Sequence, residues 1–114
     1  MTTVQDLANR LNLTTFCLAD GGCGITGGCY CGDLLSWVMG RAPAGGIWLT
    51  IMSNVNVAAV AALTDLSCVI LTEGVAPDDS LLQKARAQGV NLLGTPLSTY
   101  DCAVCLSRLL QAQA

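Results

Sequence analysis

The chain has 114 residues, of which 53% are hydrophobic and 11% are charged, and its formal net charge is −3. This length predicts a single domain, 1–114, that can bury a core without help from a metal or a disulfide. Its five basic residues are scattered, which excludes nucleic-acid binding as a main role, and no run approaches the roughly 20 apolar residues that span a bilayer.

Hydrophobic periodicity predicts short strands and helices along the whole chain. The expected strands are 15–19, 29–31, 47–52, 67–72 and 90–94. The expected helices are 4–11, 34–39, 54–63, 78–87 and 100–110. Between the first two strands, five of the nine residues in 20–28 are glycine. This loop therefore either adopts backbone conformations closed to other residues or approaches another group closely.

The stretch 47–63 organises the expected fold, because an apolar strand is followed directly by an alanine-rich helix. Strands that are apolar without polar alternation are typical of parallel sheets covered on both faces. From residue 47 onward the order is strand, helix, strand, helix, strand, helix, and right-handed crossovers place helices on both sides of the sheet. The sequence therefore predicts a three-layer α/β fold with a mostly parallel sheet.

Residues that suit helix termini occur at the expected boundaries. The expected N-caps are Thr2 or Thr3, Asp33, Ser53 or Asn54, and Asp78 or Asp79. Gly40 and Gly89 are expected to end the second and fourth helices. The N-terminus has no secretory signal, which predicts a cytoplasmic protein that does not engage a membrane.

Small polar residues follow the carboxyl ends of the three central strands, where ligands settle in open α/β sheets. Nearby helix N-termini would suit an anion, and the hypothesis is a pocket for a small anionic or adenine-nucleotide ligand. Ordinary helix capping is the simpler explanation for half of these residues. The candidate ligand-binding residues are Ser53, Asn54, Asn56, Glu73, Gly74, Thr95, Ser98 and Thr99.

The seven cysteines form the second candidate constellation. Thiolates bind soft metals and iron–sulfur clusters, and two thiols three apart share one face of a helix. The candidate ligands are Cys23, Cys29, Cys31, Cys102 and Cys105. Their spacings match no standard zinc or ferredoxin pattern, and buried cysteine is the simpler interpretation.

Enzyme chemistry finds little support in the sequence. The chain has no histidine, so the commonest general base is missing. The glycines of the 20–28 loop could cradle a phosphate with backbone amides, but no lysine lies nearby and no P-loop pattern is present. Gly22, Gly24 and Gly27 match the letters of a dinucleotide fingerprint, yet they do not open a long helix.

Several motifs in their order resemble the DRTGG domain family. They are Gly24-Ile25-Thr26-Gly27-Gly28, Cys31-Gly32-Asp33-Leu34-Leu35-Ser36, Trp48-Leu49-Thr50-Ile51 with Asn54, Val69-Ile70-Leu71-Thr72-Glu73-Gly74, and Leu93-Gly94-Thr95 before Tyr100. Thr26, Gly27 and Gly28 match the family motif, whereas Gly24 and Ile25 stand where the family has Asp and Arg.

The resemblance implies an α/β domain similar to the N-terminal domain of HPr kinase, with a regulatory and not a catalytic role. Such domains occur in phosphotransacetylases and between the CBS domains of some pyrophosphatases, where they take part in dimer contacts and nucleotide response. Stand-alone versions occur near genes for iron-only hydrogenases and iron–sulfur proteins.

We therefore expect a non-catalytic regulatory or interaction domain that forms a homodimer. Its low charge favours a covered surface, and the apolar run 34–39 is the expected partner surface. The alternative is an iron–sulfur or thiol redox partner of a hydrogenase-type system, with an iron–sulfur cluster as its cofactor. A third function class, an enzyme, has the weakest support.

Overall fold

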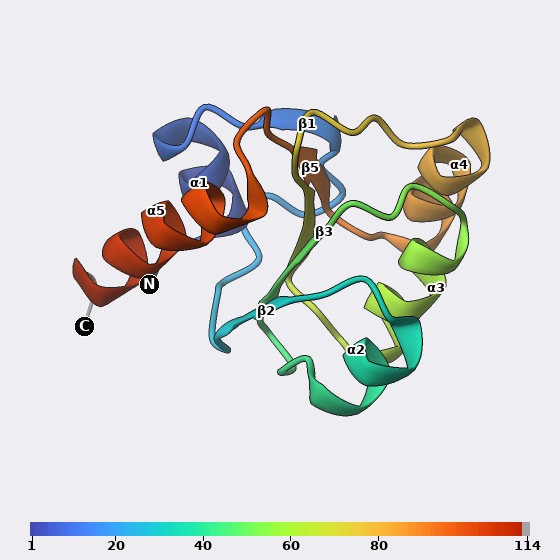
Figure 1. The fold of residues 1–114 in the computed structure, drawn as a ribbon, viewed down its shortest axis with the longest axis horizontal. Coiled ribbons are helices and arrows are strands. Elements are labelled where there is room, and N and C mark those ends of the chain that lie inside the picture. Colours follow the sequence, from blue (N-terminus) through green and yellow to red (C-terminus); the bar gives the residue numbers. More distant parts are fainter. Residues whose placement is uncertain (113–114) are drawn as a thin grey trace.

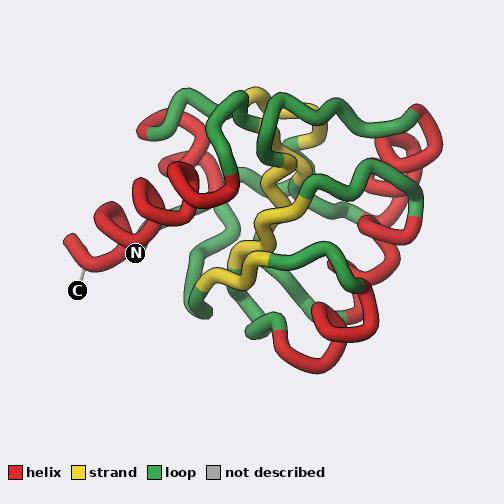
Figure 2. Tube along the Cα trace, in the orientation of Figure 1, coloured by secondary structure: helices red, strands yellow, loops and turns green. Residues whose placement is uncertain are grey.

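A computed structural model describes residues 1–112 of the chain. Helices and strands alternate for most of its length (Figure 1; Figure 2). The strands are β1 (Thr14–Cys17), β2 (Cys29–Cys31), β3 (Ile47–Thr50), β4 (Cys68–Leu71) and β5 (Leu92–Gly94). The helices are α1 (Val4–Arg10), α2 (Leu35–Arg41), α3 (Asn56–Leu63), α4 (Asp79–Gln88) and α5 (Thr99–Ala112).

The strands form a five-stranded sheet in the order β1-β5-β4-β3-β2. Strands β2, β3, β4 and β5 are parallel, and β1 pairs with β5 in the antiparallel sense. Helices α1 and α5 cover one face, while α2, α3 and α4 cover the other (Figure 1). The predicted three-layer α/β fold with a mostly parallel sheet is confirmed.

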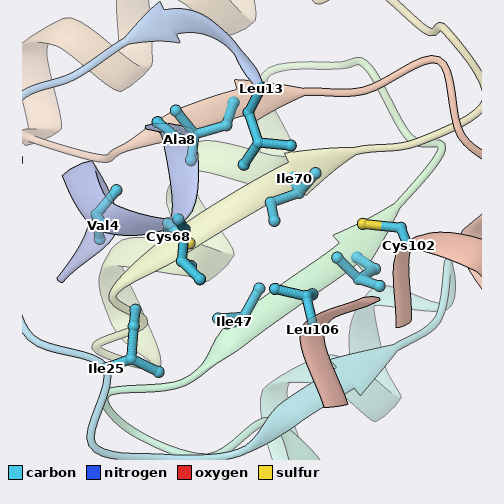
Figure 3. Close-up of a cluster of buried hydrophobic side chains, with 12 residues drawn as sticks. Val4, Ala8, Leu13, Ile25, Ile47, Cys68, Ile70, Cys102 and Leu106 are labelled. Atoms are coloured by element: carbon cyan, nitrogen blue, oxygen red, sulfur yellow. The ribbon is translucent and has the colours of Figure 1, made fainter. Parts of the chain in front are cut away.

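Two apolar cores explain why the central strands are apolar without alternation. Ile47, Leu49 and Ile70 point to the core under α1 and α5, shown in Figure 3. Trp48 and Val69, the intervening residues, point to the core under α2, α3 and α4. Because side chains alternate between the two faces of a strand, a sheet covered on both sides needs an apolar residue at every position.

The helix termini follow the sequence expectations only in part. Thr3 caps α1, and its hydroxyl accepts a bond from the Asp6 amide in a complete capping box. Gly89 ends α4 in the left-handed conformation, as predicted. The cap assigned to Asp33 was wrong, because Leu34 is the N-cap of α2 and makes no side-chain bond. The stop assigned to Gly40 was also wrong, since α2 continues to Arg41.

The start of α3 also differs from the expectation. The N-cap is Val55, and the helix begins at Asn56. The Asn54 Oδ1 still accepts a bond from the Asn56 amide at 3.0 Å, which satisfies one of the amides that a helix start leaves without an intrahelical partner. No helix within residues 1–112 is both long and apolar enough to cross a membrane.

Candidate functional site

The three central parallel strands each run into a buried threonine at their carboxyl ends. Thr50 ends β3, Thr72 follows β4 and Thr95 follows β5, and their residues are 1%, 0% and 5% exposed. The Thr72 amide donates to the Thr50 carbonyl at 3.1 Å, so the pairing of β3 and β4 extends into this row. We call these three residues the threonine row, and the carboxyl edge of the sheet around it the rim.

Four of the candidate ligand-binding residues meet beside the threonine row. The Thr72 and Thr99 hydroxyls are 2.7 Å apart, which joins the end of β4 to the start of α5. The Thr99 amide donates to Glu73 Oε2 at 3.3 Å, and the Gly74 amide donates to the Thr95 carbonyl at 3.0 Å. The structure therefore brings Glu73, Gly74, Thr95 and Thr99 into one cluster.

The backbone at Glu73 is held in an uncommon conformation. Glu73 and Gly74 are consecutive left-handed residues, with φ of 61° and 73°. A non-glycine side chain rarely adopts this region. The Glu73 amide donates to the Leu97 carbonyl at 2.8 Å, which ties this turn to the segment before α5. The turn and this bond together hold the Glu73 carboxylate at the N-terminus of α5.

The remaining candidates make their hydrogen bonds outside the Glu73 cluster. The Ser98 Oγ accepts from the Asp101 amide at 3.0 Å and so caps α5. The Ser53 carbonyl accepts from the Asp78 amide at 3.0 Å, linking the end of β3 to the start of α4. Among residues 1–112 no hydrogen bond joins Ser53, Asn54 or Asn56 to the Glu73 cluster.

Sequence reasoning missed the role of Asp33 at this rim. Its Oδ1 accepts from the Thr50 hydroxyl at 2.7 Å and from the Ile51 amide at 3.0 Å. The Thr50 Oγ1 in turn accepts from the Met52 amide at 3.1 Å. The available signal was the position of Asp33 just after β2, since the carboxyl ends of parallel strands meet at one edge.

The rim is rich in carboxylates and lacks cations. Asp33, Glu73 and Asp78 are exposed acids in the segments that follow β2 and β4. All five basic residues of the chain lie outside the rim segments 50–56, 72–78 and 95–99. A ligand at the rim would therefore donate hydrogen bonds to these carboxylates or displace one of them from a helix N-terminus.

The Thr26-Gly27-Gly28 loop does not join this site, because it lies at the opposite end of the sheet. The Thr26 and Gly27 amides both donate to the Gly45 carbonyl at 3.0 Å, just before β3 begins. A Cβ on Gly27 would lie 2.6 Å from the Ala44 carbonyl oxygen. Glycine at 27 therefore permits a close contact between two backbone segments.

The five candidate metal ligands are not assembled into a metal site. Within residues 1–112, no group of three or more Cys, His, Asp or Glu side chains is placed to hold a metal ion. Cys102 is buried among aliphatic side chains (Figure 3), and Cys105 is half-buried. The iron–sulfur hypothesis therefore has no support from the geometry.

For four of the seven thiols, those of Cys29, Cys31, Cys68 and Cys102, desolvation raises the pKa and favours the neutral form. Desolvation, with a smaller contribution from the neighbouring Cys31, raises the pKa of Cys29 to about 12. Burial likewise raises the pKa of Cys102 to about 11, and it raises the pKa of Cys68. A protonated thiol is a poor nucleophile and a poor metal ligand, so the buried Cys68 and Cys102 act as small apolar residues.

Comparison with known proteins agrees with this architecture. The family model of the DRTGG domain matches residues 49–109, more than half of the chain. A similar solved structure is that of the CBS and DRTGG domains of the regulatory region of Clostridium perfringens pyrophosphatase, complexed with its activator diadenosine tetraphosphate. The TM-score is 0.72 at 12% identity, and the match covers 92% of this chain and 46% of that one. Comparison with curated protein sequences finds no match.

Proposed function

The chain belongs to the DRTGG domain family, and from that premise we propose that it is a non-catalytic regulatory domain that binds an adenine nucleotide at the rim. The observation that carries the proposal is the cluster of Glu73, Gly74, Thr95 and Thr99 at the carboxyl ends of parallel strands. This is the edge at which ligands of open α/β sheets bind. The pyrophosphatase regulatory region, part of which has this fold, was solved with a nucleotide activator.

Glu73 gives the proposal a specific form. Its carboxylate accepts a bond from the Thr99 amide at the start of α5, where a helix N-terminus favours negative charge. A phosphate oxygen would compete for the same amide. We infer that a nucleotide phosphate displaces the Glu73 carboxylate, and that the freed turn at Glu73 and Gly74 transmits binding to a partner or a neighbouring domain.

Calorimetric titration with ATP tests this proposal. Replacing Glu73 by Gln removes a competing charge, so we expect Glu73→Gln to tighten ATP binding about fivefold, the scale of a charge at a helix N-terminus. Asp65→Asn is the matched control, because Asp65 is an exposed acid that lies outside the rim and has φ of 57°, a conformation that asparagine tolerates.

Three outcomes would contradict the proposal. One is no ATP binding by either the parent protein or Glu73→Gln at millimolar nucleotide. Another is an equal gain in Glu73→Gln and Asp65→Asn, which would indicate a general charge effect. Release of inorganic phosphate during the titration would contradict the non-catalytic part.

We also propose that the domain forms a homodimer through α2 and the edge of the sheet beside it. Leu34, Trp37 and Met39 are 58%, 51% and 45% exposed, which is unusual for large apolar side chains on one short helix. The Arg41 guanidinium lies over the Trp37 ring, 3.9 Å from its centre, in a cation–π contact. A hydrogenase-type redox partner remains a prediction from the family resemblance alone.

Sedimentation velocity at micromolar concentration tests the dimer. Leu34→Asp is a suitable variant, because residue 34 is the N-cap of α2, where aspartate is favoured, so the fold should tolerate the change. We expect a dimer for the parent protein and a monomer for Leu34→Asp. Tyr100→Asp is the control, since Tyr100 is 76% exposed in the first turn of α5. A monomeric parent protein would overturn the dimer.

A further inference from the structure

A shallow hollow is lined by the end of α1 and by α5. These two helices lie on the same face of the sheet (Figure 1). Its volume is about 580 Å³, within the range of small-molecule sites, and it is open to solvent. The lining residues are Arg10, Leu11, Cys105, Arg108 and Leu109. None of these residues belongs to the rim.

The hollow gathers two of the five basic residues of an acidic chain. Both arginines are exposed, so their guanidinium groups are accessible to a ligand. Arg10 lies in the last turn of α1, where a cation also stabilises the helix dipole. That explanation does not extend to Arg108, which is not in the last turn of α5.

The nearest acid of α1 is engaged elsewhere. The Asp6 carboxylate accepts a bond from the Thr3 amide at 2.9 Å and completes the capping box at the other end of the helix. Arg10 is only a minor cause of the lowered pKa of Asp6, whose main cause is the bond from the Thr3 backbone. The capping box therefore leaves Arg10 available at the hollow.

The apolar wall of the hollow is preformed. Leu11 and Leu109 are half-buried and pack against the core under α1 and α5. Their positions are fixed by that core, so a ligand would not have to order them. The site thus combines two guanidinium groups with a fixed apolar surface.

We propose that this hollow binds a small organic anion whose phosphate or carboxylate lies between Arg10 and Arg108. The apolar body of the ligand rests on Leu11 and Leu109. Guanidinium groups pair with either kind of oxyanion in the same bidentate geometry, and the leucines select against fully hydrated inorganic anions.

Phenyl phosphate is the probe, with inorganic phosphate and phenol as its two halves. We expect phenyl phosphate to bind at least about tenfold more tightly than either half, because charge-assisted bonds and apolar contact act together. Arg108→Gln should weaken binding about tenfold, the scale of one charged hydrogen bond. Arg86→Gln is the matched control, because Arg86 is an exposed arginine on α4, on the other face of the sheet.

The thiol of Cys105 reports the location independently, because it lines the hollow. Phenyl phosphate should slow alkylation of Cys105 while leaving that of Cys31, an exposed residue on β2, unchanged. Equal weakening by Arg108→Gln and Arg86→Gln would overturn the proposal, as would unprotected Cys105. Phenyl phosphate binding that responds to Glu73→Gln and not to Arg108→Gln would assign the ligand to the rim and also overturn it.

Discussion

The two ends of the parallel sheet are built in different ways. At the amino end, segments before the strands approach one another closely through backbone atoms, as when the Ile47 amide donates to the Gly28 carbonyl at 2.9 Å. At the carboxyl end, exposed side chains add hydrogen bonds to the backbone ones, as when the Glu73 carboxylate accepts from the Thr99 amide. A backbone contact leaves little room for a ligand, whereas side chains can exchange their partners. The difference favours the rim as the binding end.

The buried Asn91 shows how the amino end is closed. Its side-chain amide donates to the Asp20 carbonyl at 2.9 Å and the Ser67 carbonyl at 3.0 Å, and its oxygen accepts from the Asp20 amide at 2.8 Å. One side chain thus ties the glycine-rich loop to the starts of β4 and β5. The family motif residues 26–28 lie at this end too, where the Thr26 and Gly27 amides donate to the Gly45 carbonyl.

The largest expected effect is at Gly27. A Cβ there would lie 2.6 Å from the Ala44 carbonyl oxygen and 2.9 Å from the Gly46 nitrogen, both backbone atoms that cannot move aside. We expect Gly27→Ala to lower the free energy of unfolding by about 3 kcal/mol, measured by urea denaturation. Gly28→Ala is the control, because no atom lies within 4 Å of the added Cβ. Similar losses for the two variants would contradict a backbone contact at 27.

Asn91→Ala should have the next largest effect. The change removes three hydrogen bonds and leaves the groups around Asp20 and Ser67 without partners, which should lower the free energy of unfolding by about 2 kcal/mol. Hydrogen exchange should also become faster in the 20–28 loop. If the free energy of unfolding falls but hydrogen exchange in the 20–28 loop does not become faster, Asn91 does not hold the loop in place.

Thr72→Val tests the carboxyl end with a smaller expected loss. Valine keeps the shape of threonine and removes only the hydroxyl that pairs with Thr99, so we expect about 1 kcal/mol of destabilisation. Thr14→Val, at an exposed position of β1, is the control for the chemical change. The effect should be smaller than that of Gly27→Ala. A larger loss of stability in Thr72→Val than in Gly27→Ala would contradict a rigid amino end and a rim whose side chains can change partners.

The smallest effect concerns alkaline pH. Cys29 and Cys68 begin β2 and β4 at the amino end, and desolvation raises the pKa of both. Because the folded protein favours the neutral thiols, their contribution is fully present below the unfolded pKa of about 8.5 and declines as pH rises toward 12. Cys29→Ala should reduce the loss of stability between those values. An unchanged pH profile would indicate that the Cys29 thiol titrates normally in the fold.

The parallel core was predictable because 47–52 and 67–72 are apolar except at Thr50, Ser67 and Thr72 and show no polar alternation, a pattern with few alternatives. The candidate cluster at Glu73, Thr95 and Thr99 followed from that topology. Asp33 was not predictable in the same way, because an aspartate just before a helix suggests a local cap. Its bonds to Thr50 and Ile51 cross 17 and 18 residues of sequence, which no local pattern encodes.

The segments that the glycine-rich loop contacts could likewise not be predicted from the sequence. Glycines at 20–28 indicate close backbone approach, but they do not say which segment is approached. Residues 26–28 approach Gly45-Gly46 before β3, where a Cβ on Gly46 would lie 2.6 Å from the Gly28 carbonyl oxygen. Residues 21–25 instead form backbone hydrogen bonds with residues 2–5 at the start of α1. The many glycines indicate that a close backbone contact exists, but only the fold shows which two segments make it.

Mapping of backbone amide shifts by NMR during an ATP titration tests the central claim most directly. We predict that the largest shifts fall in 72–75 and 95–99, with smaller ones in 53–56, and that the amides of 26–28 and 45–46 stay in place. Shifts concentrated in 26–28 and 45–46, or no saturable shift at any residue, would contradict the assignment of the rim as the ligand-binding end.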